Sequence, residues 1–201
     1  MIRARPLPPP RGLSGGVAGG PPAGPGGWIP AARATDLVIS PRGARFLGRR
    51  FPCVLGRGGC VPGAAKAEGD GATPLCVTYA RQVWRPASRP PAGGALPETA
   101  IGPDLGWGDD PALGGYNGPV RLSARGGRGA ERMLRPDRLY RLVVETGWNA
   151  DAPVPGRGSA IFLHVRKGLL SPTAGCAAFA EGDLRWILAR WTRRSRIFFR
   201  P

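Results

Sequence analysis

Hydrophobic residues in this 201-residue chain gather, from Asp36 onward, in short runs rather than in long stretches. The runs are rich in β-branched and aromatic residues and are separated by glycine or proline, which is typical of strands joined by turns. Four early runs predict antiparallel strands, and two later runs are the most strand-like of all: 37–39, 44–47, 51–55, 75–79, 139–144 and 160–165. The stretch from Pro86 to Pro119 lacks this pattern and is expected to be irregular.

One helix is predicted near the end of the chain. Four apolar residues repeat at positions i, i+3, i+4 and i+7: Leu184, Ile187, Leu188 and Trp191. This spacing places them on one face of a helix, which should pack on the sheet. Residues 196–199 then supply a short final strand. The sequence therefore predicts a mainly β domain with a C-terminal helix and a short final strand.

The first 34 residues differ in composition from the rest. Residues 1–34 contain eight glycines, eight prolines and no acidic residue. Such a segment buries too little apolar area to offset the entropy lost on ordering. We therefore expect a Gly/Pro-rich flexible tail at 1–34 and one folded domain of ordinary size at 35–201. No export signal is readable, and no apolar run reaches the roughly 18 residues that a membrane span needs.

The formal net charge of +16 brings other classes of function into view. All basic residues except Lys66 and Lys167 are arginines, and arginine, glycine, alanine and proline all have GC-rich codons. The charge thus reflects base composition, an anionic envelope partner or nucleic-acid binding. The Gly/Arg tract 125–128 resembles RNA-binding segments and keeps an Arg/Gly-rich nucleic-acid binder as the alternative from a different class. A short single tract is weak support, so no nucleic-acid partner is expected.

Chemistry concentrates between Gly156 and Cys176. His164 ends a hydrophobic strand, and Cys176 follows twelve residues later, after a loop punctuated by Pro172 and Gly175. An imidazole beside a thiol makes an acyl-transfer nucleophile, although a buried structural thiol and a strand-end histidine are the plain alternatives. Backbone N–H groups near Gly175 are candidates for an oxyanion hole, and Thr173 is a candidate for orienting the loop.

Metal chemistry has little support in the sequence. The four cysteines include no Cys-x-x-Cys pair, and His164 is the only histidine. Zinc sites draw mainly on clustered Cys and His ligands, so a zinc site is not expected here. No metal and no cofactor is predicted. Cys53, Cys60 and Cys76 are expected to be structural or free thiols.

The segment Ser159–His164 together with Thr173-Ala174-Gly175-Cys176 resembles the histidine strand and Ser/Thr-x-Gly-Cys signature of L,D-transpeptidases, the YkuD fold. The likeness extends upstream through further landmarks of a compact bacterial branch: 47–50, 66–74, 109–111, 116–117 and 137–144. It covers about residues 36–200 in the family's order.

This resemblance implies a β-sandwich or barrel-like catalytic domain that acts on peptidoglycan stem peptides in the periplasm or cell envelope. Cys176 would form a thioester with release of D-alanine, His164 would serve as its base, and an amine would accept the acyl group. L,D-carboxypeptidase hydrolysis by the same site is the alternative. Arg157 and Ser159 are candidate substrate-binding residues, and a solvated surface arginine is the other interpretation of Arg157.

Overall fold

The computed structural model describes residues 5–6, 30–123 and 128–201. Two six-stranded sheets and one small sheet account for its strands. The first large sheet has the order β4 (Arg49–Phe51), β3 (Gly43–Phe46), β2 (Leu37–Ser40), β16 (Ile197–Phe199), β7 (Thr73–Thr78) and β6 (Cys60–Pro62). The second has the order β5 (Cys53–Val54), β15 (Ala177–Phe179), β14 (Phe162–Val165), β13 (Val143–Thr146), β8 (Ala80–Pro86) and β9 (Glu98–Ile101).

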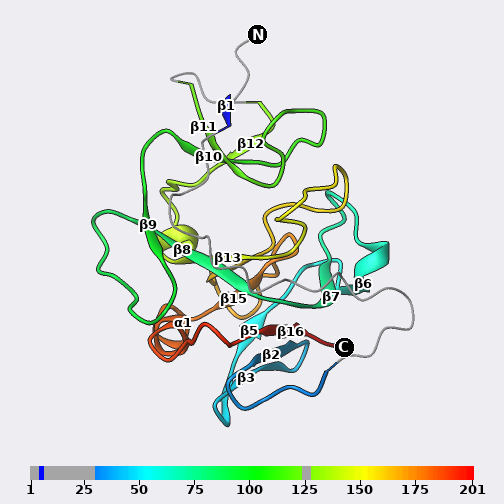
Figure 1. The fold of residues 1–201 in the computed structure, drawn as a ribbon, viewed down its shortest axis with the longest axis vertical. Coiled ribbons are helices and arrows are strands. Elements are labelled where there is room, and N and C mark those ends of the chain that lie inside the picture. The colour runs from blue at the N-terminus through cyan, green and yellow to red at the C-terminus, as the bar shows by residue number, and fades with distance from the viewer. Residues whose placement is uncertain (1–4, 7–29, 124–127) are drawn as a thin grey trace.

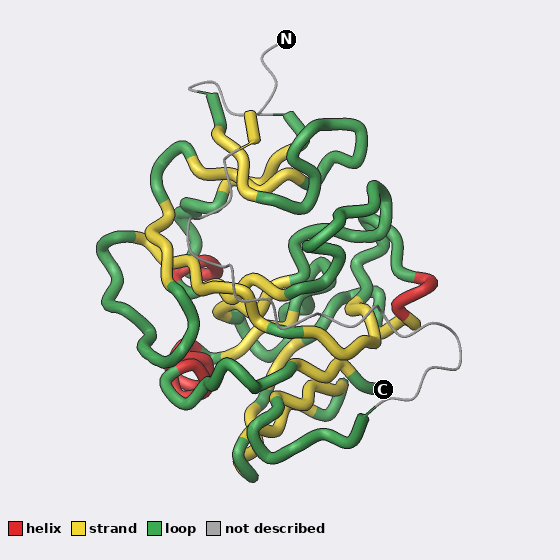
Figure 2. The backbone as a smooth tube through the Cα atoms, viewed as in Figure 1, coloured by secondary structure: helices red, strands yellow, loops and turns green. Residues whose placement is uncertain are grey.

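The small sheet stands at the opposite end of the molecule from β2 and β3 (Figure 1). Its order is β1 (Arg5–Pro6), β11 (Pro119–Arg121), β10 (Leu105–Gly108) and β12 (Ala130–Arg132). Helical structure is sparse (Figure 2). It comprises the helix α1 (Glu181–Leu188) and two 3-10 turns, η1 (Gly63–Ala65) and η2 (Leu139–Arg141), within the described residues. The predicted mainly β fold with a C-terminal helix and a final strand is confirmed.

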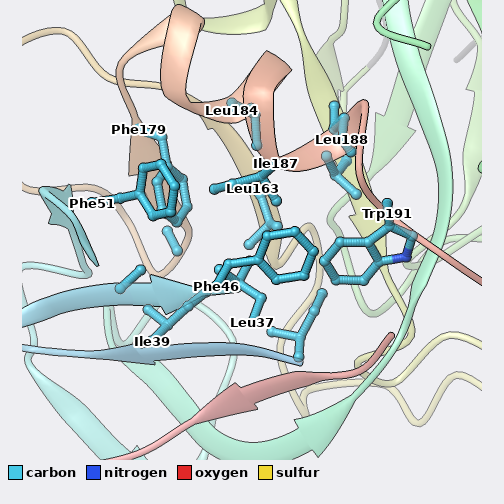
Figure 3. Packing of buried hydrophobic residues seen from close by; sticks show 14 of the residues in the cluster. Leu37, Ile39, Phe46, Phe51, Leu163, Phe179, Leu184, Ile187, Leu188 and Trp191 are labelled. Carbon is cyan, nitrogen blue, oxygen red and sulfur yellow. The ribbon is translucent and has the colours of Figure 1, made fainter. Parts of the chain in front are cut away.

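The main core lies between the two large sheets and α1 (Figure 3). It combines β2 and β3 with β14, β15 and the apolar stripe of the helix: Leu37, Ile39, Phe46, Leu163, Phe179, Leu184, Ile187 and Leu188. Trp191 lies beyond the last helical residue but is buried, and its ring stacks on Phe46 at a centroid distance of 5.7 Å. The predicted stripe therefore does bury against the sheet, although the helix itself ends one turn earlier.

Residues of the second large sheet alternate between two buried clusters. Val144 and Leu163 face the main core, whereas Val143 and Phe162 face a second cluster that also contains Cys176. His164 lies opposite Val143 in the β13–β14 register and two residues after Phe162. Because side chains alternate along a strand, these three share one face of the sheet. The second cluster thus lies on the same face as the predicted base.

Two local predictions were wrong. The run 139–144 was expected to be one strand, but residues 139–141 form η2 and the strand begins at Val143. The Asp137 carboxylate accepts a hydrogen bond from the Leu139 N–H at 3.3 Å, which stabilises the turn in place of a ladder. The stretch 86–119 was expected to be irregular but contains β9 and β10. In β10, Leu105–Gly108, glycine alternates with large residues and all four are buried, so no polar alternation marks the strand.

Residues 30–34, the described end of the expected tail, contact the domain. The Arg33 guanidinium pairs with the buried Asp36 carboxylate at 3.2 Å, and the Ala34 carbonyl accepts from the Leu47 N–H at 2.8 Å. The Pro30 and Ala31 carbonyls accept from Arg200 and Arg196. Within the expected tail, Arg5 and Pro6 also pair with β11 as the strand β1. Residues 1–4 and 7–29 lie outside the described residues, so the flexibility of the tail stays a prediction.

A chain that begins at Pro30 loses the two-residue edge strand β1 but keeps every contact of residues 30–34, so it is expected to melt within about 2 °C of the full chain. A chain that begins at Thr35 should melt roughly 2 to 6 °C lower, because Asp36 loses one of its two arginine partners. Thermal unfolding followed by circular dichroism measures both. A large drop for the Pro30 chain would show that the first 29 residues stabilise the domain.

Candidate active site

Cys176 is held at the entry to β15. The parallel β14–β15 register pairs Leu163 with Ala177, so Cys176 lies beside Phe162 on the neighbouring strand. The Phe162 N–H donates to the Cys176 Sγ at 3.4 Å, and the thiol donates to the Ala160 carbonyl at 3.0 Å. The residue is buried, with 8% of its surface exposed. The loop between β14 and β15 thus places Cys176 beside Phe162, which is two residues before His164 in β14.

His164 is held by one hydrogen bond and one ring contact. Its Nδ1 lies 2.8 Å from the Val165 carbonyl oxygen. Since a carbonyl only accepts, Nδ1 carries the proton, and Nε2 of the neutral ring keeps its lone pair. The Tyr140 ring meets the imidazole edge-to-face at a centroid distance of 5.6 Å. The imidazole is therefore fixed in the tautomer that a general base requires.

Both side chains are neutral near pH 7. Burial raises the pKa of the Cys176 thiol from 9.0 to about 12, and the Phe162 N–H opposes that rise. Burial also lowers the pKa of His164 below its ordinary value of 6.5, against the hydrogen bond to the Val165 carbonyl. Desolvation disfavours the charged form of each group, which explains both directions. The resting site is thus a thiol and an imidazole rather than a thiolate–imidazolium pair.

Two threonines hold the loop before the cysteine. The Thr173 hydroxyl donates to the Cys176 carbonyl at 2.7 Å and accepts from the Gly175 N–H at 3.1 Å. The Thr73 hydroxyl donates to the Gly175 carbonyl at 2.8 Å and accepts from the Gly56 N–H. Thr173 therefore lies where an orienting residue should. The Gly175 N–H is occupied by Thr173, so it is not a free oxyanion donor in this state.

Gly175 adopts a backbone conformation that side chains resist. Its φ is +134°, and a Cβ there would lie 2.9 Å from the Ala72 carbonyl oxygen. The glycine is therefore needed both for its dihedral angle and for the close approach of residue 72. This pair of constraints fixes how the Cys176 backbone enters the strand.

Gly175→Ala is expected to lower the free energy of unfolding by about 1 to 3 kcal/mol and to impair any reaction at the thiol. Gly114→Ala is the matched control, since no atom lies within 4 Å of a Cβ built there. Urea unfolding of the two variants measures the difference. Equal stabilities would show that the loop relaxes around residue 175 without cost.

The L,D-transpeptidase catalytic domain (YkuD) family model matches residues 35–198. The chain belongs to this family. The match spans both large sheets, the helix and the Cys176 loop, in agreement with the resemblance in the sequence. Searches of the curated proteins and of the solved structures gave no match. The family acts on peptidoglycan peptides, so an enzyme of the L,D-transpeptidase type is the coarse assignment.

Of the two candidate substrate-binding residues, Ser159 lies at the site and Arg157 lies beside it. Ser159 is buried, with 7% of its surface exposed, in the segment that leads to Ala160. Arg157 is half-buried, and its guanidinium donates to the Gly63 carbonyl at 3.3 Å. Their roles toward a substrate stay predictions.

A polar network behind His164 was missed by the sequence analysis. The Tyr140 hydroxyl donates to Glu131 at 2.9 Å, and Arg135 pairs with the same carboxylate at 2.6 Å while its guanidinium lies 5.1 Å from the Tyr140 ring centre. Burial raises the pKa of Glu131. The network locks the Tyr140 ring that meets the imidazole. The sequence gives no sign that the two residues meet, because Glu131 lies in β12 and Tyr140, within the landmark 137–144, lies in a segment predicted to be a strand.

Asn117 also supports the site. Its side-chain carbonyl accepts from the Ala160 N–H at 2.9 Å, and its amide donates to the Trp148 carbonyl at 3.0 Å. Ala160 has a φ of +52°, which is unusual for a residue with a side chain. Asn117 thus stabilises the bend whose carbonyl accepts the thiol hydrogen. Its only sequence signal is its place among the family landmarks.

The remaining candidates are three cysteines and the Gly/Arg tract, part of which lies outside the described residues. Cys53, Cys60 and Cys76 are free thiols, as expected. In residues 5–6, 30–123 and 128–201 no cluster of His, Cys, Asp or Glu is arranged to hold a metal ion. No helix in those ranges is long and apolar enough to cross a membrane. In the Gly/Arg tract, residues 124–127 lie outside the described residues, and Arg128 is exposed.

Proposed function

We propose that this enzyme transfers the acyl group of a peptidoglycan stem peptide through a thioester on Cys176. One observation carries the proposal: a neutral thiol and a neutral imidazole with a free Nε2 occupy adjacent parallel strands on the same sheet face. Family membership supplies the substrate class. The reaction would take place in the periplasm or cell envelope, where that substrate is found.

In the first half-reaction, the thiol turns from the Ala160 carbonyl toward His164 and loses its proton to Nε2 as Sγ attacks the donor carbonyl carbon. The C–N bond to the terminal D-alanine then breaks, and the imidazolium returns the proton to the leaving amine. A concerted transfer suits a pair that is neutral at rest, because neither charge has to exist before substrate binds. The product is a thioester plus free D-alanine.

In the second half-reaction, His164 takes a proton from an acceptor amine that attacks the thioester, and the thiol is regenerated. Water at the same position would give the L,D-carboxypeptidase outcome. The oxyanion of both tetrahedral intermediates needs backbone donors, and with the Gly175 N–H held by Thr173 we assign this role to the Cys176 N–H.

Mass spectrometry of the intact protein after incubation with a tetrapeptide muropeptide tests the proposal. The expected adduct equals the donor mass less one D-alanine, and hydroxylamine should remove it because thioesters react with this nucleophile. Analysis of the released products separates a crosslinked dimer from a hydrolysed tripeptide. A protein that gains no adduct and releases no D-alanine would overturn the proposal.

A further inference from the structure

Lys66 is a buried cation close to the site. Only 5% of the residue is exposed, whereas Lys167, the other lysine of the chain, is exposed. The Lys66 Nζ donates to the Asp70 carboxylate at 2.6 Å and to the Ala67 carbonyl at 2.8 Å. An ammonium has three N–H donors, so these contacts leave one for another acceptor. Burying an ammonium group costs desolvation free energy, and this one still has an unused N–H donor. Both facts favour a role in binding an anion.

The ammonium lies against the segment that leads to Cys176. A Cβ built on Gly158 would be 3.0 Å from the Lys66 Cε and 3.1 Å from its Nζ, so the lysine packs directly against the backbone of this glycine, whose φ of +87° disfavours other residues. Ala160, two residues further on, accepts the hydrogen of the Cys176 thiol. Burial raises the pKa of that thiol, and the Lys66 charge is among the influences that oppose the rise. The ammonium is therefore within electrostatic reach of Sγ.

Ser159 supplies an independent observation. It lies between Gly158 and Ala160, and its hydroxyl is buried without a hydrogen-bond partner among the described residues. A buried polar atom with no partner is destabilising, so such atoms concentrate where a ligand or water completes the set. The Ser159 hydroxyl is thus an unused donor, and the Lys66 ammonium, which lies against Gly158, has a second unused donor.

We propose that Lys66 and Ser159 bind the terminal carboxylate of the acyl donor. The inference rests on the proposed function and identifies the residues that would recognise the C-terminal carboxylate of the donor peptide. In a tetrapeptide, the D-alanine carboxylate is only three bonds from the carbonyl carbon that Sγ attacks. An anion site must therefore lie beside the thiol, and two hydrogen-bond donors match the two oxygens of a carboxylate. This pair would restrict the enzyme to the last peptide bond of a stem.

All three groups belong to one small buried region. Cys176, Lys66 and Ser159 are exposed to 8%, 5% and 7%. The thiol donates to the Ala160 carbonyl, Ser159 precedes that residue, and Lys66 lies against Gly158. A donor whose carbonyl carbon meets Sγ therefore brings its carboxylate to this same segment.

The decisive experiment compares two donors that differ only at the end group: a tetrapeptide with a terminal D-alanine and one with a terminal D-alaninamide. Wild type should acylate from the acid with a kcat/KM roughly 10- to 100-fold higher than from the amide. Lys66→Met should bring that ratio close to one, while the exposed control Lys167→Met keeps it. A purely structural role for Lys66 lowers both rates together and leaves the ratio unchanged, which would overturn the proposal.

Two further variants protect the test against misfolding. If Asp70 without its partner prevents Lys66→Met from folding, Lys66→Met/Asp70→Asn removes both charges and is measured in its place. Ser159→Ala should fold at least as well as wild type and lower the acid-to-amide ratio about threefold to tenfold. An unchanged acid-to-amide ratio in Ser159→Ala would show that Ser159 does not bind the carboxylate. If wild type forms no thioester with either donor, the proposed function fails instead, so the two failures are distinguishable.

Discussion

Replacing Cys176 by alanine should abolish thioester formation and lower turnover by a factor of about 10⁴ or more. The reason is chemical, since the proposed mechanism passes through a bond to Sγ and alanine offers no nucleophile. The fold should survive, because the thiol is small and its two hydrogen bonds are weak contacts to backbone atoms. Product formation from a muropeptide donor, measured by chromatography, gives the activity of the folded variant.

The other three cysteines are the matched controls. Burial raises the pKa of Cys53 and of Cys76 to about 12. Cys53 lies in β5, with β15 between it and the strand of His164, and Cys76 lies in the other large sheet. Both pack against the main core rather than the cluster on the His164 face. Alanine at position 53, 60 or 76 should leave thioester formation within about threefold of wild type and affect mainly stability. Full turnover in Cys176→Ala would remove this residue from the mechanism. A comparable loss in Cys53→Ala, with an unchanged melting temperature, would point to a different thiol.

Much of the fold followed from local patterns. The strands at 37–40 and 162–165 combine β-branched or aromatic residues with a nearby Pro41 or Gly158, and the stripe that begins at Leu184 has a helical period. These signals are local and survive in the structure. The sheet order is not local: β16 joins β2 in parallel across about 160 residues, and β5 caps the edge of β15. No periodicity encodes such a pairing.

The proximity of His164 and Cys176 was predictable for a related reason. A histidine at a strand end and a cysteine after a Gly-punctuated loop are close in sequence, and a short parallel crossover brings them to neighbouring strands. The supporting residues were not predictable in this way. Thr73 belongs to the landmark 66–74, and its hydroxyl donates to the Gly175 carbonyl across 102 residues, a contact that no local pattern reports. Asn117 bonds Ala160 across 43 residues, and Lys66 lies against Gly158 across 92 residues (158 minus 66).

Tyr140 shows how a misassigned turn hides a functional side chain. Had residues 139–141 continued β13, Tyr140 and Leu142 would alternate with Arg141 across the sheet. The 3-10 turn instead directs the Tyr140 ring to the edge of His164 and its hydroxyl to Glu131. The Asp137 carboxylate accepts from the Leu139 N–H in this turn, a contact of one side chain that hydrophobic patterning does not report.

Replacing His164 by glutamine should lower acylation near pH 7 by about 10² to 10⁴, the usual contribution of a general base. Glutamine keeps the approximate size of the side chain but cannot take up a proton. The loss is expected in kcat rather than in KM, because the imidazole contacts the reacting proton and not the bound peptide. Rapid-quench mass spectrometry of the thioester measures the rate constant directly.

The pH profile of that rate constant distinguishes a base from a packing residue. In wild type the imidazole must be neutral to accept the thiol proton, and burial lowers its pKa, so the acid limb should fall below pH 6.5. Above that limb the rate should be nearly flat. In His164→Gln only the ionised thiol can attack, and burial raises the thiol pKa to about 12, so the rate should rise about tenfold per pH unit through pH 10.

Iodoacetamide alkylation of Cys176 in His164→Gln should show the same slope without substrate. A folded His164→Gln protein with a wild-type profile would mean that another group takes the proton, and Glu131, which lies beside Tyr140 and influences the Cys176 thiol, would be the next carboxylate to substitute.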